Sequence, residues 1–371
     1  MIKIATILGA RPQFVKASIL SQLFKLRKDF KEIIIHTGQH YDFEMSEIFF
    51  KQLNIPKPHY NLGIKSNFHG EMTGKMIIEI EKVLLKIKPN FTIVYGDTNS
   101  TLAGALASNK LGIQVVHIEA GLRSFNKKMP EEINRVLTDY CSSYFFVPSN
   151  LSRIQLLKEN IKEENIFLVG DVMFDLYLSL KKKIENISKK IKKNYVDKFI
   201  LVTFHRAENI KSIKKIRNII SNFSDLSKKI KIIFLIHPAT KKKLNKYKLY
   251  KKLKKIVYVM KPQGYIQTMA LLKNCRLLIT DSGGMQKEAF YSKIPCLTLR
   301  DETEWPETLR NGFNKLVNIK NRSIYKNAIK SLNLNSFKNN ASKVKMIYGA
   351  GNASQLIIKK LKILSTNNKL K

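Results

Sequence analysis

One recurring pattern restricts the folds open to this chain: a short apolar run ends in a polar, glycine-containing turn, and a helix follows. The stretch Leu277–Glu288, LLITDSGGMQKE, shows it most clearly, with Ser282, Gly283 and Gly284 at the turn. The first N–H groups of a helix lack partners within the helix, and the helix dipole favours an anion there. The pattern therefore predicts a phosphate-binding turn, with Glu288 placed to accept hydrogen bonds from ribose hydroxyls. The same residues could also form an ordinary strand-to-helix turn.

The N-terminus repeats the pattern. Residues 2–8 are apolar and predict a strand, and a helix is expected from Gln13 to Leu26. The turn between them directs Arg11 and Lys16 towards one spot, an arrangement that suits an anion. The turn has no GxGxxG fingerprint, so we expect no bound NAD.

Strands alternate with helices along the whole chain. Such alternation is typical of doubly wound parallel sheets, which bind ligands at the carboxyl ends of their strands. We expect two Rossmann-like α/β domains that face a cleft, at 1–175 and 199–345, with a linker in the charged stretch 179–198. Other predicted strands are 33–37, 91–95, 115–118, 144–147, 199–203, 232–236, 257–260, 277–279 and 296–299, and a helix is expected at 75–87.

Polar residues follow several of these strands. Asp97 and Glu119 end two strands of the first half, and Glu131 begins a helix on which Arg135 shares its face. Glu131 and Arg135 could equally form a surface ion pair. The second half offers histidines and an amide at its strand ends, and either histidine could instead be a packed, hydrogen-bonded residue. Acids for a sugar and cations for a diphosphate together suggest a nucleotide-sugar enzyme. The strand-end residues of the second half are His205, His237 and Gln263.

The net charge of +39 is unevenly distributed. Up to Gly170 the chain has 22 Lys and Arg against 16 Asp and Glu, and from Asp171 onward it has 45 against 12. Nucleic-acid binding is one interpretation of this excess. The basic runs are rich in Lys and poor in Arg, without an aromatic stacking platform or a recognised nucleic-acid module. We therefore interpret them as solvated surface and expect no nucleic-acid partner.

Other classes are excluded by length and spacing. No apolar run reaches the length of a membrane span. Met1 leads directly into a predicted strand, so we expect no signal peptide. Cys141, Cys275 and Cys296 have no metal-binding or redox spacing. We expect reduced thiols, no metal site and a cytoplasmic location.

Eight motifs, in this order, carry a family resemblance: GARPQFVK, TGQH, VYGDTNST, HIEAGLRS, MPEEINR, HRAEN, TDSGGMQKEA and RDETEWPE. Together they resemble the non-hydrolysing UDP-N-acetylglucosamine 2-epimerase family nearly end to end. The resemblance implies a glycosyltransferase-B-like fold, a UDP-sugar substrate, no cofactor and a homodimer that makes precursors of surface polysaccharides such as lipopolysaccharide. It also implies that the C-terminal segment 346–371, with a helix at 352–364, packs back on the first domain.

The resemblance further implies a mechanism. Inverting C2 breaks a C–H bond that no neighbouring carbonyl activates, so UDP leaves from C1 as a carboxylate takes the C2 proton, and UDP then adds back. The essential acids of the family match Asp97, Glu119 and Glu131, and its essential histidine matches His205. Gln39 and His40 match part of a second, regulatory UDP-sugar site. Nucleotide and cleft contacts match Arg11, Lys16, Arg135, His237, Gln263, Ser282, Gly283, Gly284 and Glu288.

The chain departs from the family pattern at several positions. Gln13 replaces a glutamate, Trp305 replaces an arginine, Thr268 replaces an aromatic residue, and 64–74 differs from the usual allosteric lining. These variants are similar to a sister group that acts on UDP-2,3-diacetamido-2,3-dideoxyglucuronate, because a neutral Gln13 spares an anionic sugar like-charge repulsion. The motifs are also compatible with a hydrolysing relative of the epimerases and with a transferase of the same fold.

Overall fold

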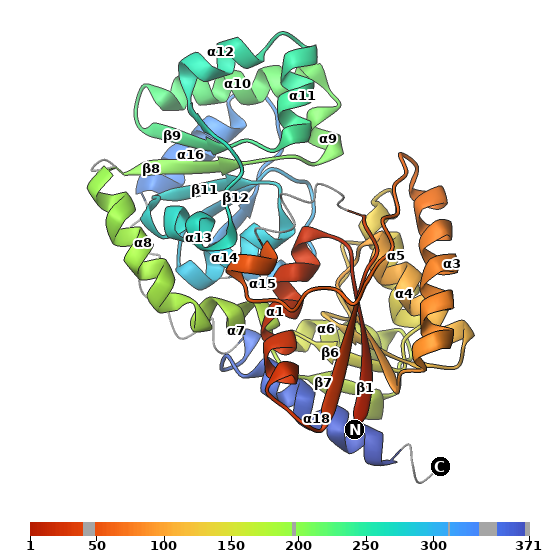
Figure 1. Cartoon of the computed structure of the whole chain (residues 1–371). Coiled ribbons are helices and arrows are strands. Elements are labelled where there is room, and N and C mark those ends of the chain that lie inside the picture. The colour runs from red at the N-terminus through yellow and green to blue at the C-terminus, as the bar shows by residue number, and fades with distance from the viewer. Residues whose placement is uncertain (40–48, 195–197, 311, 334–346, 368–371) are drawn as a thin grey trace. The chain divides into compact units, whose positions relative to one another are not determined.

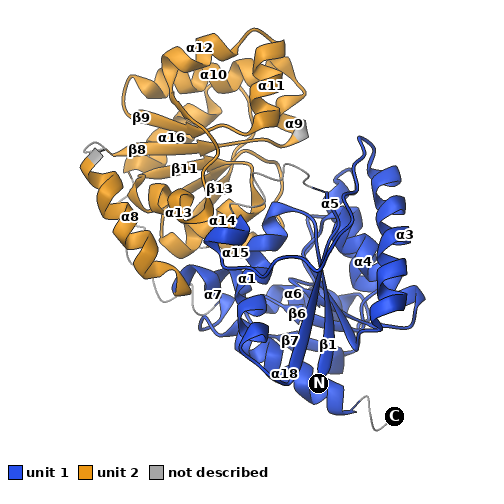
Figure 2. Cartoon of the chain, viewed as in Figure 1, with its two compact units in different colours: residues 1–178, 345–371 blue, residues 179–344 orange. Residues whose placement is uncertain are grey.

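The computed structural model describes residues 1–39, 49–194, 198–310, 312–333 and 347–367. The chain divides into two compact units (Figure 2). Unit 1 comprises Met1–Leu178 together with Lys345–Lys371, and unit 2 comprises Ser179–Val344. His40, predicted as part of a regulatory site, lies outside the described residues.

Unit 1 contains a seven-stranded sheet in the order β3-β2-β1-β4-β5-β6-β7. Figure 1 labels β1, β6 and β7 of this sheet. All of the described strand pairs in it are parallel. Parallel strands place their carboxyl ends at one edge of the sheet, which is where the predicted site residues of this unit follow β4 and β5. The strands are β1 (Ile2–Leu8), β2 (Phe30–His36), β3 (Tyr60–Asn61), β4 (Phe91–Tyr95), β5 (Gln114–Ile118), β6 (Tyr144–Val147) and β7 (Ile166–Leu168).

Helices of unit 1 bury apolar faces such as Met76, Ile80 and Leu84 of α3 against the sheet. The C-terminal helix α18 packs against α1 in this unit. Asp175 caps α18, since its carboxylate accepts hydrogen bonds from the backbone N–H groups of Ala353 (3.1 Å) and Ser354 (2.7 Å). The helices are α1 (Arg11–Lys25), α3 (His69–Ile87), α4 (Asn99–Lys110), α5 (Pro130–Tyr140), α6 (Asn150–Lys158), α7 (Val172–Ser179) and α18 (Ala353–Asn367), with a 3₁₀ turn at Glu163–Asn165.

Unit 2 contains a six-stranded sheet in the order β10-β9-β8-β11-β12-β13, and its described strand pairs are also parallel. Phe204 and Phe234 stack in its core with ring centroids 4.9 Å apart. The strands are β8 (Phe199–Thr203), β9 (Lys231–Leu235), β10 (Tyr258–Met260), β11 (Leu277–Thr280), β12 (Cys296–Thr298) and β13 (Asn314–Leu316). The helices are α8 (Lys181–Asn194), α9 (Ala207–Ile210), α10 (Ile213–Ser227), α11 (Pro238–Lys246), α12 (Tyr250–Ile256), α13 (Tyr265–Asn274), α14 (Gly283–Ser292), α15 (Pro306–Arg310) and α16 (Ser323–Asn333).

The predicted α/β class with two parallel sheets is confirmed, and the element boundaries show where local patterns fall short. The stretch in which we placed a linker forms the helix α8, which packs against α13 and is tied to it by the Glu185–Lys273 ion pair (2.8 Å). α3 begins six residues before the predicted start at Lys75. Its first turns contain Gly70 and Gly74, which are poor helix formers and conceal the helix in the sequence.

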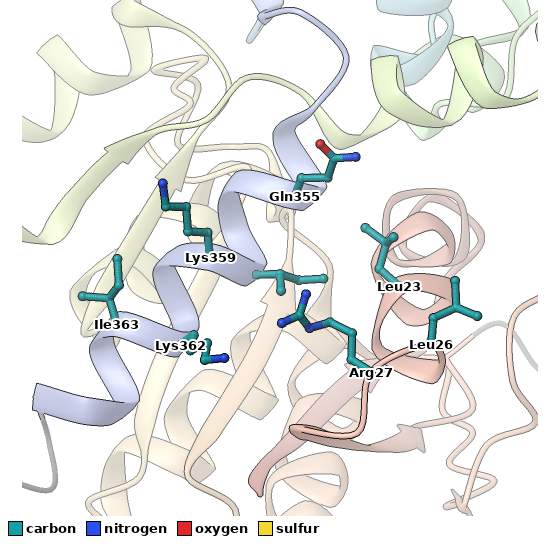
Figure 3. A pocket seen from close by; sticks show the side chains of 8 residues that line it. Leu23, Leu26, Arg27, Gln355, Lys359, Lys362 and Ile363 are labelled. Atoms are coloured by element: carbon teal, nitrogen blue, oxygen red, sulfur yellow. The ribbon is translucent and has the colours of Figure 1, made fainter.

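A shallow pocket lies between the C-terminal end of α1 and the helix α18 (Figure 3). Its rim carries Arg27 and Lys362, both of which bind Asp29 just before β2 begins. The pocket therefore lies at the amino-terminal edge of the sheet, opposite to the edge that carries the predicted site residues. Among the described helices, none is both long and apolar enough to cross a membrane.

Candidate functional site

Asp97 and Glu119 lie side by side in unit 1, because they follow β4 and β5, which are neighbouring parallel strands. Glu119 has φ of +70°, in the left-handed region that residues other than glycine rarely adopt. Its N–H donates to the carbonyl of Phe146 (3.0 Å), which holds this conformation in place. Strained backbone of this kind clusters at functional sites.

Lys16 and Glu119 form a buried ion pair, with Lys16 Nζ 2.5 Å from Glu119 Oε1. Gly96, with φ of +66°, supplies the space for it: a Cβ on Gly96 would come within 2.5 Å of Lys16 Nζ. Any larger residue at position 96 would push the lysine away from the carboxylate. The charge of Lys16, predicted to face an anionic ligand, is therefore compensated within unit 1 by Glu119.

Arg135 is only 2% exposed and binds two carboxylates, those of Asp97 and Glu132. Glu132 Oε2 also accepts from the N–H and the hydroxyl of Ser124, at 2.8 and 2.9 Å. The sequence pattern paired Arg135 with Glu131, whereas the structure places Arg135 against Asp97, which lies far away in the sequence. Glu131 is half-buried at the second position of α5.

A second buried network lies behind Asp97 and Glu119. His117 on β5 contacts the carbonyl of Gly96 through Nε2 (2.8 Å) and the carboxylate of Asp139 through Nδ1 (2.6 Å). Asp139 also accepts from Arg123 Nη1 (2.7 Å). Burial favours a higher pKa for Asp139, but the opposing charges and hydrogen bonds of His117 and Arg123 outweigh burial and hold its pKa below the ordinary value. Sequence reasoning missed His117 and Arg123 as site residues, although both belong to the motif HIEAGLRS.

Gln13 is fully buried at the start of α1, and both ends of its amide are bound within unit 1. Oε1 accepts from the N–H groups of Gly9 (2.8 Å) and Ala10 (3.0 Å), and Nε2 donates to Thr101 Oγ1 (3.1 Å). The interpretation of Gln13 as a contact for an anionic sugar did not include this structural role. A neutral amide offers an acceptor to the two N–H groups and a donor to the opposite side, whereas an ionised glutamate could only accept.

Two other predicted residues also have partners in unit 1. The guanidinium of Arg11 lies over the ring of Phe49, 4.4 Å from its centroid. Gln39 Oε1 accepts from the N–H (3.0 Å) and the hydroxyl (2.7 Å) of Ser100, near the start of α4. Gln39 therefore lies at the carboxyl edge of the sheet, beside the turn that carries Asp97.

In unit 2 the predicted phosphate-binding turn opens α14. Ser282 is the N-cap, its hydroxyl accepts from the N–H of Met285 (3.5 Å), and Gly283 and Gly284 are the first two residues of the helix. A Cβ on Gly283 would come within 2.2 Å of Glu304 Oε1, so a larger residue would displace that buried carboxylate. Three successive N–H groups at a helix start are typical of an anion site.

Asp281 organises the loop that carries His205. Its carboxylate accepts from the N–H groups of His205 (3.0 Å) and Arg206 (2.9 Å) and from the amide of Asn209 (2.9 Å). The His205 ring stacks on that of His237, with centroids 5.0 Å apart. The two predicted histidines are thus brought together. Sequence reasoning missed Asp281, although it directly precedes Ser282 in the motif TDSGG.

The remaining residues of unit 2 range from buried to half-buried. Trp305 is 2% exposed, and Lys287 Nζ lies 3.9 Å from its ring centroid. Trp305, which stands where the family often has an arginine, thus forms a buried cation–π pair. Glu288 is buried in α14, and Gln263 Nε2 donates to the carbonyl of Lys261 (2.9 Å).

In the described part of the chain we find neither a metal-binding cluster nor a reactive thiol among Cys275 and Cys296. No group of three His, Cys, Asp or Glu side chains there is arranged to hold a metal ion. Cys275 and Cys296 are buried and free of disulfides. Burial raises the pKa of the Cys296 thiol to about 12, which leaves it protonated and unreactive at neutral pH.

Two Rossmann-like units, one with acids at its strand ends and one with a glycine-containing turn that opens a helix, are consistent with a glycosyltransferase-B-like nucleotide-sugar enzyme. The chain belongs to the UDP-N-acetylglucosamine 2-epimerase family, whose model matches residues 23–362.

Curated relatives resemble this chain over nearly its whole length. A UDP-N-acetylglucosamine 2-epimerase of Methanocaldococcus jannaschii is 48% identical over 85% of this chain and 88% of its own. A UDP-2,3-diacetamido-2,3-dideoxy-D-glucuronate 2-epimerase of Pseudomonas aeruginosa is 45% identical over 96% of this chain and 98% of its own. A solved structure of the M. jannaschii UDP-GlcNAc 2-epimerase in complex with UDP-GlcNAc and UDP matches with a TM-score of 0.90 and 44% identity, covering 98% of this chain and 100% of that one.

Proposed function

We propose that this protein inverts C2 of UDP-N-acetylglucosamine to give UDP-N-acetylmannosamine, without a cofactor. The observation that carries the proposal is the pair of carboxylates at neighbouring strand ends, Asp97 and Glu119, each bound to a cation that is itself buried. Carboxyl groups held in fixed positions are what proton removal and return at one carbon require. The names of the relatives support the same reaction.

The proposed epimerisation has two steps, the elimination of UDP and its re-addition. One carboxylate among Asp97, Glu119 and Glu131 takes the C2 proton while the C1–O bond to UDP breaks, which leaves a C1–C2 double bond. UDP then adds back to C1 as a second carboxyl group protonates C2 from the opposite face. Charge on the departing diphosphate needs positioned N–H donors and cations, which are worth most when they are preorganised.

We assign the binding of UDP mainly to unit 2. The turn Ser282–Gly284 offers N–H groups to the diphosphate, His205 is tied to this turn through Asp281, and Glu288 is assigned to the ribose. Burial of Glu288 supports a single, oriented acceptor rather than a solvated one. The other residues assigned to substrate binding are Arg11, Lys16, Arg135, His237 and Gln263.

A second candidate substrate is UDP-2,3-diacetamido-2,3-dideoxyglucuronate. The 45% identity to an epimerase named for that sugar equals the 45% identity to a UDP-N-acetylglucosamine 2-epimerase of Methanococcus maripaludis. A UDP-N-acetylglucosamine 2-epimerase of Methanocaldococcus jannaschii is 48% identical, so overall similarity separates the two sugars by too little to choose between them. The choice depends on the residues that contact the sugar itself.

We further propose that the protein is a homodimer that works in the cytoplasm and supplies units for surface polysaccharide. α5 exposes Ile133, Leu137 and Tyr140, which recur at helical spacing on one face. α3 exposes Ile78 and Leu85, seven residues apart, and α4 packs between these two helices. Exposed apolar side chains on the two helices that flank α4 are typical of a surface that a second copy covers.

Proton NMR in heavy water tests the reaction. The purified protein is incubated with UDP-N-acetylglucosamine and no added cofactor. We expect deuterium at C2 and the appearance of UDP-N-acetylmannosamine, with no free sugar. Exchange only with the diacetamido-glucuronate would establish the second candidate substrate. Release of free N-acetylmannosamine and UDP would indicate the hydrolysing reaction, and an absence of exchange with both sugars would refute the epimerase proposal.

A further inference from the structure

His117 is completely buried, and both of its ring nitrogens face groups that only accept hydrogen bonds. Nε2 lies 2.8 Å from the backbone carbonyl of Gly96, and Nδ1 lies 2.6 Å from Asp139 Oδ1. The other oxygen of Asp139 accepts from Arg123 Nη1 (2.7 Å) and from the N–H of Gly121 (3.2 Å), and the permanent charge of the guanidinium favours Asp139 as an ionised carboxylate. A neutral imidazole has one donor nitrogen and one acceptor nitrogen, whereas an imidazolium has two donors.

The charges around the ring balance. Arg123 also binds Glu159 through Nε (2.8 Å) and Nη2, so two carboxylates face one guanidinium in this network. A positive His117 completes two cations against two anions. Buried charges persist when they are paired and hydrogen-bonded in this way, and an uncompensated carboxylate in this position would be costly.

The His117 ring holds the Gly96–Asp97 corner, the turn after β4 that carries one of the predicted acids. The N–H of Gly96 donates to the carbonyl of Ile118 (3.0 Å), and the carbonyl of Gly96 accepts from His117, so the end of β5 clamps this residue from both sides. Gly96 is also the residue whose missing Cβ leaves room for the Lys16–Glu119 pair, and Asp97 follows directly. Movement of the Gly96 peptide would therefore displace both Asp97 and the lysine that holds Glu119.

We propose that His117 is a positioning residue that is held as an imidazolium by Asp139 and that fixes the Gly96–Asp97 corner for catalysis. It touches no substrate in this role and acts through the peptide of Gly96. The part of the proposal that concerns catalysis rests on the proposed epimerase function, whereas the protonation of the ring does not.

NMR of the wild-type protein, labelled with ¹⁵N at its histidine side chains, tests the protonation of the ring at pH 7.5. Replacing the other six histidines one at a time identifies the His117 signals without altering His117. We expect both of its nitrogens to carry protons. An unprotonated nitrogen in the His117 ring would overturn the proposal, and this outcome does not depend on the identity of the substrate.

Asp139→Asn sharpens this test. The new amide must turn its oxygen towards Arg123 and Gly121, which leaves its NH₂ facing Nδ1 of His117. The ring should then switch to the neutral form protonated only on Nε2, which keeps the hydrogen bond to Gly96. A His117 ring that stays doubly protonated in this variant would refute the dependence on Asp139.

Kinetics test the positioning role. His117→Gln should lower kcat by about 10- to 100-fold, as expected when a group that orients the reacting residues is lost, and should change KM far less. The matched control is His59→Gln, because His59 lies in the same unit and accepts from the N–H of Ile34 (3.1 Å) away from the site. A kcat for His117→Gln within about twofold of the control would overturn the positioning role and leave the epimerase proposal standing.

Discussion

Replacing Glu32 by glutamine should stabilise the protein at high pH and leave its stability unchanged at low pH. Glu32 lies on β2, and its Oε1 accepts from the hydroxyls of Thr6 (2.6 Å) and Ser21 (3.0 Å), both of which are buried. Burial raises the pKa of Glu32 to about 7 from an ordinary 4.5, although the two hydrogen bonds oppose the shift. Neither of these hydroxyl groups belongs to a predicted site residue.

The direction in which the free energy of unfolding changes with pH depends on whether the folded or the unfolded state binds more protons. Below pH 4.5 the carboxyl group is protonated in both states and contributes nothing. Between pH 4.5 and 7 the unfolded chain ionises while the folded chain keeps its proton, so stability falls as pH rises and levels off above 7. At about 1.4 kcal/mol per pKa unit, the rise from 4.5 to about 7 corresponds to at most about 3.5 kcal/mol. We expect a loss of about 3 kcal/mol, because part of Glu32 reaches the surface.

Thermal unfolding of the wild type and of Glu32→Gln at pH 4.5 and pH 8, at one ionic strength, measures this effect. Glutamine keeps the acceptor for both hydroxyls and removes the ionisation. For a unit of this size, about 3 kcal/mol corresponds to a rise in Tm of roughly 6–12 °C at pH 8. Glu79→Gln is the control, because the Glu79 side chain is 43% exposed, lies in the same unit and pairs with Lys82. An equal change in Tm at both pH values, or a lower Tm of Glu32→Gln at pH 8, would refute the reasoning.

Three further predictions concern the site and the dimer. Asp97→Asn and Glu119→Gln should each lower the rate of C2 deuterium exchange by at least about 100-fold, because each removes a carboxylate that can exchange a proton. Gly283→Ala should weaken UDP binding by about 10-fold or more in calorimetry, since its Cβ would come within 2.2 Å of Glu304 Oε1 and force the turn and that carboxylate apart. Leu137→Lys should convert a dimer into a monomer in light scattering, because it places a charge in the exposed apolar surface of α5.

Matched variants separate these effects from general damage. Gly70→Ala is the control for Gly283→Ala, since a Cβ at position 70 meets nothing within 4 Å. Leu356→Lys is the control for the dimer, because Leu356 is also an exposed leucine, on α18. Near-normal exchange in the Asp97 or Glu119 variant would remove that residue from the mechanism. Equal UDP affinities of the two glycine variants would contradict the role of the turn, and an intact dimer of Leu137→Lys would place the interface elsewhere.

Much of the fold was predictable because it follows from local sequence patterns. Apolar runs of four to seven residues ending in polar turns identify parallel strands, and this alternation determined two sheets and their carboxyl edges. Asp97 and Glu119 could be placed together because they follow strands that pair directly. The turn at Ser282–Gly284 was also local, since a serine cap and two glycines are sufficient to open a helix.

Only the tertiary structure decided which partners these residues have. Arg135 binds Asp97, which lies 38 positions away in the sequence. Gln13 is buried and donates a hydrogen bond to Thr101, and Lys287 forms a buried cation–π pair with Trp305. Spacing along a helix predicts neighbours within one turn or two, but partners from separate strands become neighbours only when the sheet assembles. Burial then determines which charged groups pair, because an unpaired charge is costly where water is excluded and ion pairs are stronger there. The sequence by itself thus determined where the polar groups emerge, and the packing of the sheet determined which of them carry charge together.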